Sequence, residues 1–224
     1  MTLNALGKRA AAAGAMSPAG WDAVARAVES KASTMNAQEV GMTLNALGKR
    51  EAAAGAMSPA GWDAVARAVE STAPTMTPQG VANTLNALGK LEVAAGAMSP
   101  PGWDAVARAV ESAAPAMNEQ EVSMFLNAMG QLNAAAGAMS LAGWDAVARA
   151  VESTAPTMTP KGLANTLAAL ANLPAVSSRL PAPAWERLQT VSEELIQKMS
   201  LEESRRARWA CQKISALFKR ASSE

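Results

Sequence analysis

The chain has 224 residues, of which 50% are apolar but only 4% aromatic, and its net charge at pH 7 is +1. This balance excludes a chain that is drawn as a whole to nucleic acid or to a membrane surface, because such attraction needs an excess of positive charge. The lack of histidine excludes serine–histidine and cysteine–histidine nucleophile pairs and histidine metal sites.

An internal repeat dominates the sequence. The string AMSPAGWDAVARAVES at residues 15–30 returns nearly unchanged further along the chain, and a period near 40 residues is typical of supersecondary units that stack on copies of themselves. Intervals of 41 residues separate Trp21, Trp62, Trp103, Trp144 and Trp185. The chain therefore divides into repeat units 1–34 (partial), 35–75, 76–116, 117–157 and 158–198, followed by an expected C-terminal capping helical segment at 199–224.

The chain starts inside a repeat, because MTLNALGK at 1–8 matches MTLNALGK at 42–49. No targeting segment is visible, so we expect further sequence upstream that can hold one. No run reaches the roughly 18 apolar residues that a membrane span needs. We therefore expect no membrane span in this chain.

The sequence of each unit predicts two helices, of which the first begins at MNAQEV or MTPQGV. Asn36 or Thr77 can cap its free backbone N–H groups, and Pro78 suits the first helical position. Asn36 and Glu39 together match a capping box. The sequence therefore fixes where these helices start.

The second helix of each unit begins at SPAGW, with Ser58 as its cap and Pro59 as its first residue. The links AAAGAM and STAPTM carry the glycine and proline that we expect to stop each helix. No segment alternates apolar and polar residues as a strand does. The predicted fold is all-α, an α-solenoid of stacked helical hairpins with a 41-residue repeat.

The second helix has one apolar face, formed in the unit at 35–75 by Trp62, Val65, Ala66 and Val69. We interpret the tryptophan series as core rather than as a ligand site, because each buried indole removes about 200 Å² from water. On another face, Asp63 and Arg67 have the spacing of an ion pair, and Glu70 can also reach Arg67.

The first helix carries a row of polar residues opposite its apolar face. Apolar side chains at Val81, Leu85 and Leu88 share one face of this helix. The opposite face carries what we call the polar stripe, formed by Gln79, Asn83, Asn86 and Lys90. The matching positions are Gln38, Met42, Asn45 and Lys49; Gln120, Met124, Asn127 and Gln131; Lys161, Asn165, Ala168 and Asn172; and Met1, Asn4 and Lys8 in the partial unit.

The residue types of the polar stripe suit a nucleic acid. Amides can pair with base edges, methionine offers a polarizable surface to a base, and lysine attracts phosphate. Repeat proteins that read single-stranded RNA place two or three such side chains against each base. The alternative is that this helix face is only solvated. Asparagine is a mediocre helix former, so its recurrence at Asn4, Asn45, Asn86 and Asn127 slightly favours a role in contacting a ligand.

Three segments carry a family resemblance, ANTLNALGKL at 82–91, ANTLAALANL at 164–173 and LPAPAWERL at 180–188. Together they resemble the octotricopeptide repeat of algal organelle proteins, and the resemblance extends from residue 1 to about 198. It implies an α-solenoid that binds single-stranded RNA in a chloroplast or mitochondrion and supports transcript stability, processing or translation. Related proteins also serve as scaffolds in organelle ribonucleoprotein assemblies.

Two functions therefore stay open. One is an RNA-binding repeat protein, and the other is a protein-interaction scaffold of a larger assembly. The near-neutral charge favours the scaffold.

We expect neither an enzyme nor a cofactor, because no phosphate-binding loop appears and the single Cys211 has apolar neighbours. One cysteine also forms no internal disulfide and favours a reducing compartment. In the tail, we expect Trp209, Ile214, Leu217 and Phe218 to close the stack, under a basic outer face.

Overall fold

The computed structural model of the protein describes residues 17–177 and 180–221, and every regular element within these ranges is helical. The predicted all-α class is therefore confirmed. The chain divides into two compact units, Met1–Ala109 and Val110–Glu224, and helix α9 (Pro100–Ala113) crosses the boundary. None of the described helices is both long and apolar enough to cross a membrane.

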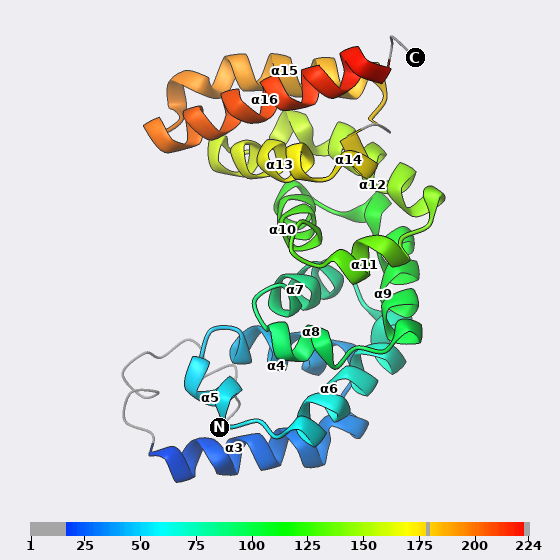
Figure 1. The fold of residues 1–224 in the computed structure, drawn as a ribbon, viewed down its shortest axis with the longest axis vertical. Coiled ribbons are helices and arrows are strands. Elements are labelled where there is room, and N and C mark those ends of the chain that lie inside the picture. Colours follow the sequence, from blue (N-terminus) through cyan, green and yellow to red (C-terminus); the bar gives the residue numbers. More distant parts are fainter. Residues whose placement is uncertain (1–16, 178–179, 222–224) are drawn as a thin grey trace. The chain divides into compact units, whose positions relative to one another are not determined.

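The first unit runs through α3 (Pro18–Lys31), η1 (Ala32–Thr34), α4 (Ala37–Leu47), α5 (Glu51–Gly55), α6 (Pro59–Thr72), η2 (Ala73–Thr75), α7 (Pro78–Leu88) and α8 (Glu92–Gly96) (Figure 1). The second runs through η3 (Ala114–Ala116), α10 (Glu119–Met129), α11 (Asn133–Ala138), α12 (Leu141–Thr154), η4 (Ala155–Thr157), α13 (Pro160–Asn172), α14 (Pro174–Ser177), α15 (Ala182–Leu195), η5 (Ile196–Lys198) and α16 (Leu201–Ala221).

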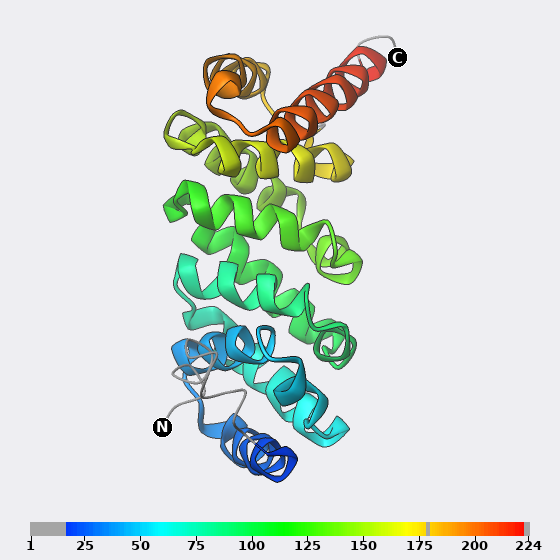
Figure 2. The same ribbon diagram turned by 90° about the vertical axis from the view of Figure 1, so that its left-hand side faces the viewer.

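Helices at matching repeat positions pack side by side within each unit. In the first unit, α4 packs against α7 and α3 against α6. In the second unit, α10 packs against α13 and α12 against α15 (Figure 2). The polar stripes of consecutive first helices are therefore neighbours within a unit.

The predicted helix starts are confirmed. The Asn36 side chain accepts from the backbone N–H of Glu39, whose carboxylate accepts from the N–H of Asn36 at 2.9 Å. Thr77 and Ser58 accept from the N–H of the third helical residue in α7 and α6, and a proline holds the first helical position in both. Local capping chemistry was sufficient to place these boundaries.

The prediction of two helices per unit was wrong, because a third, short helix lies between them. The AAAGAM link forms most of α5, and its equivalents form α8 and α11. Alanine favours the helix, and a single glycine costs only about 1 kcal/mol. The STAPTM link does end its helix as predicted, since α6 ends at Thr72 and Pro74 lies in the separate 3₁₀ helix η2 that follows. No described glycine has a positive φ angle, so none ends a helix in the left-handed conformation.

The tryptophan series forms the core, as predicted. Trp21, Trp62, Trp103, Trp144 and Trp185 are each no more than 7% exposed. In the second unit, the ring centroids of Trp144 and Phe125 are 6.5 Å apart, and the angle between the two ring planes is 52°. The predicted apolar face of α6 at Val65, Ala66 and Val69 is also buried. Burial of these rings contributes a large apolar area to the core of each repeat.

Two side-chain predictions were wrong. Ile214 is buried, but Trp209 is 45% exposed and does not close the core, while the side chains of Leu217 and Phe218 lie outside the described set. Among the described residues, no ion pair joins Asp63 to Arg67. Both of these side chains are exposed, where the attraction between charges hardly exceeds the entropy lost on pairing.

The Glu70 carboxylate instead links one repeat to the next. It accepts a hydrogen bond at 2.9 Å from the hydroxyl of Ser99, which also caps α9 by accepting from Gly102 N–H at 3.0 Å. The same arrangement joins Ser58 to Glu29 and Ser140 to Glu111. These serines are therefore both helix caps and connections between repeats. The series ends before α15, where Pro181 holds the cap position without a side-chain hydrogen bond.

We expect Ser99→Ala to lower the free energy of unfolding by about 1–2 kcal/mol, because it removes the cap and leaves Glu70 without this partner. Urea denaturation followed by circular dichroism measures the change. Ser71→Ala is the matched control, since the exposed Ser71 hydroxyl donates only within its own helix, to Ala68 O. A change of equal size in both variants would contradict a connecting role for Ser99.

Candidate functional site

Every polar-stripe position in the described chain lies at the surface. In the first unit, Gln38, Lys49, Gln79 and Lys90 are exposed, and Met42, Asn45, Asn83 and Asn86 are half-buried. In the second unit, Gln120, Asn127, Gln131, Lys161 and Asn172 are exposed, and Met124, Asn165 and Ala168 are half-buried. Met1, Asn4 and Lys8 lie outside the described residues.

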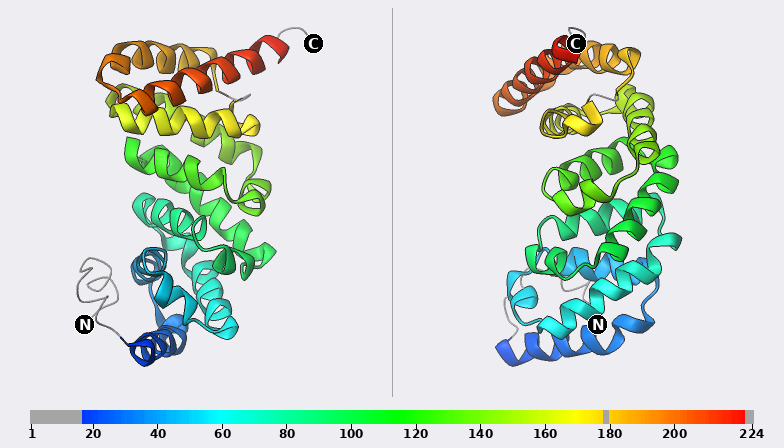
Figure 3. Two further views of the ribbon diagram at one scale, coloured as in Figure 1. Left: turned by 60° about the vertical axis from the view of Figure 1, so that its left-hand side comes forward. Right: turned by 45° about the vertical axis from the view of Figure 1, so that its right-hand side comes forward.

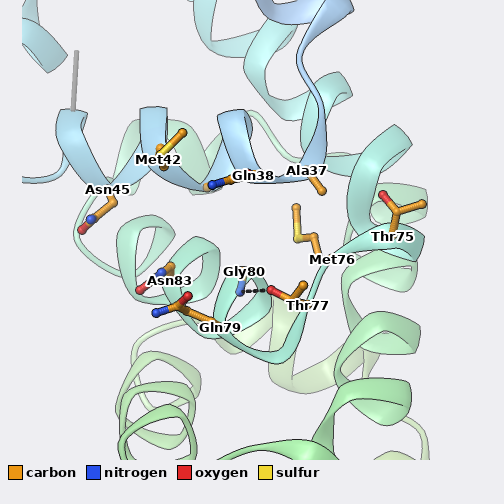
Figure 4. Close-up of a pocket in the computed structure, with 11 residues that line it drawn as sticks. Ala37, Gln38, Met42, Asn45, Thr75, Met76, Thr77, Gln79, Gly80 and Asn83 are labelled. Carbon is orange, nitrogen blue, oxygen red and sulfur yellow. Dashed lines mark hydrogen bonds between the residues drawn. The ribbon is translucent and has the colours of Figure 1, made fainter. Parts of the chain in front are cut away.

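The stripes of α4 and α7 face each other across a groove in the first unit. Its volume is about 650 Å³, and Figure 4 shows Gln38, Met42 and Asn45 on one side with Gln79 and Asn83 on the other. Met76 and Thr77, which lead into α7, form part of the wall. Two helices one repeat apart thus contribute the same residue types to a single groove.

The groove is built from neutral polar groups. None of the residues that line it carries a charge, and its walls offer amide donors and acceptors together with the Met42 and Met76 thioethers. Such a surface matches flat polar groups, which can pair at their edges and lie against sulfur. Lys49 and Lys90 follow the last residues of α4 and α7 and are exposed, so cationic groups lie at the same end of both helices.

In the second unit, two stripe asparagines have hydrogen-bond partners that were not predicted from the sequence. Asn165 Oδ1 on α13 accepts a hydrogen bond at 2.9 Å from Arg206, and Asn172 Oδ1 accepts one at 3.0 Å from Lys213. Both donors lie on α16, which packs along α13 (Figure 3). Each donor is 41 residues beyond its acceptor, so extending the repeat period into the tail would have placed the two donors at stripe positions, although not their hydrogen bonds.

A second groove lies on the row of second helices in the first unit. It measures about 500 Å³ and is bordered by Glu29, Ser33 and Arg67 together with alanines of α6. Its lining mixes both signs of charge and contains no amide side chain. This groove therefore lacks the amide and thioether groups that line the groove between α4 and α7.

The single thiol has the environment of an inert cysteine. Burial raises the pKa of Cys211, and a hydrogen bond with Ser192 offsets this rise only in part. A raised pKa leaves less thiolate at a given pH, and the thiolate is the reactive form. We expect iodoacetamide at pH 8 to modify Cys211 more slowly than free cysteine, with the difference lost in urea. Native-state modification as fast as that of free cysteine would contradict this assignment.

No protein-family model matches the sequence, and the curated proteins searched contain no match to it. The function is therefore inferred from the residues of the site and from their arrangement.

Proposed function

We propose that the chain is an α-solenoid of helical hairpins with a 41-residue repeat, and that its polar stripe binds single-stranded RNA in an organelle. The observation that carries the proposal is the groove between α4 and α7, because matching residues of two consecutive repeats line it. One repeat per base is the arrangement by which helical repeats read RNA. The bound transcript would be protected, processed or translated, as the resemblance to octotricopeptide repeats implies.

The roles of the stripe residues follow from their chemistry. The amides of Gln38, Asn45, Gln79 and Asn83 would pair with base edges, and the thioether of Met42 would lie against a base face. Lys49 and Lys90 would attract the phosphates that connect successive bases. In the second unit, Gln120, Met124, Asn127, Gln131 and Lys161 would serve in the same way. Asn165 and Asn172, whose Oδ1 atoms accept hydrogen bonds from α16, would offer their amide N–H groups.

Fluorescence anisotropy with a labelled random single-stranded RNA tests the proposal. We expect saturable binding that weakens as salt rises, because phosphate contacts release counterions. Duplex RNA should bind more weakly, since its base edges are not accessible to an amide row. The absence of binding to single strands, or affinity that does not change with salt, would contradict the proposal.

A protein-binding scaffold is the second candidate, and the near-neutral charge favours it. The chain carries 20 basic and 19 acidic residues, whereas nucleic-acid-binding domains commonly show a basic excess. Repeat proteins present extended surfaces that serve protein partners equally well. A defined protein that co-purifies with the chain after nuclease treatment, combined with no affinity for RNA, would select this function.

A further inference from the structure

Helix α16 matches the first helix of a further repeat. It begins at Leu201, which is 41 residues after Pro160 at the start of α13. Its start has the same capping box as α4, since Glu203 accepts from Ser200 N–H at 2.8 Å and Ser200 Oγ accepts from Glu203 N–H. The α16 helix therefore presents stripe positions of its own, at Glu202, Arg206, Trp209 and Lys213.

Trp209 differs from every other tryptophan of the chain. The remaining five are at most 7% exposed, but Trp209 is 45% exposed. The Lys213 ammonium lies 5.0 Å from its ring centroid and also donates to Asn172. The exposed part of the ring lies at a stripe position, where it offers a flat aromatic surface to a ligand.

The charged groups around Trp209 favour an anionic ligand. Among the described side chains of α16, basic residues outnumber acidic ones: they are Arg205, Arg206, Arg208 and Lys213 against Glu202 and Glu203. The Glu202 carboxylate is paired with Arg206 at 2.6 Å, and Glu203 is held in the capping box. The remaining positive charge lies beside an exposed aromatic ring, and this combination is typical of sites that bind single-stranded nucleic acid.

We propose that Trp209 is a stacking platform for one base of a single-stranded RNA, with Lys213 and the exposed Arg205, one helical turn before the ring, beside the adjoining phosphates. The inference rests on the proposed function and extends it, because α16 would be a binding helix as well as the end of the stack. Indole stacks on any base, so this position would add affinity without reading sequence. The amides of α13 would act on the neighbouring bases.

Affinity and fluorescence measurements on the full chain test this role. The probe is a labelled uridine oligonucleotide of about ten nucleotides, within the range of single-strand sites. We expect Trp209→Ala to weaken binding by about fivefold to a hundredfold, and Trp209→Phe to retain most of the affinity. RNA should also quench part of the wild-type tryptophan emission, a part that Trp209→Phe removes.

Two controls separate stacking from charge and from folding. Leu201→Ala, at the exposed start of α16, should leave the affinity unchanged. Polyphosphate, which has charge but no bases, should bind wild type and Trp209→Ala equally. Helical content measured by circular dichroism should be the same in all variants, because Trp209 lies outside the core.

The outcomes distinguish this inference from the proposed function. If wild-type protein binds RNA and Trp209→Ala binds as tightly, the stacking role is wrong while the proposed function stands. If wild-type protein binds no single-stranded RNA, both are wrong. A loss of affinity that is equal for RNA and polyphosphate would also overturn stacking, since it would show that the ring only supports the nearby charges.

Discussion

Replacing Trp144 by alanine is expected to lower the free energy of unfolding of the second unit by about 3–5 kcal/mol. Trp144 is 3% exposed and its ring packs against that of Phe125, which is fully buried. The substitution removes most of a large buried ring, and the surrounding helices can fill only part of the cavity. The interaction between the two rings is lost as well.

Urea denaturation followed by circular dichroism measures this loss, and the chain contains its own control. Trp209→Ala removes the same side chain from a surface position, so it should change the unfolding free energy far less. Hydrogen exchange of α10 and α12 should increase in Trp144→Ala, because both helices border the cavity. Equal destabilisation by the two substitutions would show that the buried tryptophans are not the core of the repeat.

Reversing the charge of Lys49 and Lys90 together should weaken single-stranded RNA binding by at least about tenfold near 50 mM salt. Both side chains are exposed and follow the helices that border the groove. Because each lysine that contacts a phosphate of a single strand contributes about 0.7 to the slope of log affinity against log salt, the slope should fall by about 1.4. Anisotropy titrations at several salt concentrations measure both quantities.

The control for this double variant reverses two exposed charges elsewhere in the same unit. Lys31→Glu with Arg67→Glu changes the net charge by the same amount, but both residues belong to the second helices. We expect only a small loss of affinity and an unchanged slope. A loss as large as that of Lys49→Glu with Lys90→Glu would mean that RNA responds to overall charge and not to the stripe.

The sequence predicted those features that depend on local chemistry. Asn36, Ser58 and Thr77 cap their helices as expected, because each cap needs only a side chain and a backbone N–H a few residues away. Burial of the repeated tryptophans also followed from periodicity, since Trp62 and Val69 fall on one helical face. The surface position of the polar stripe follows from the same periodicity.

Features that depend on tertiary contacts could not be predicted in the same way. The short helix α5 forms where a glycine in an alanine-rich link had indicated a stop, and packing against α3 and α4 supports it. Trp209 looked like core because it is apolar, yet the helix face on which it lies is set by how α16 packs on α13. The Arg206–Asn165 hydrogen bond joins side chains on two helices, and local propensity does not report such pairs.

Photocrosslinking of wild-type protein to a single-stranded RNA, with the modified peptides identified by mass spectrometry, tests most directly whether the polar stripe faces RNA. We expect crosslinks on stripe residues of the first helices, such as Met42, Asn83 and Met124, and at Trp209. Crosslinks confined to the second helices, around Glu29 and Arg67, would contradict RNA binding by the polar stripe.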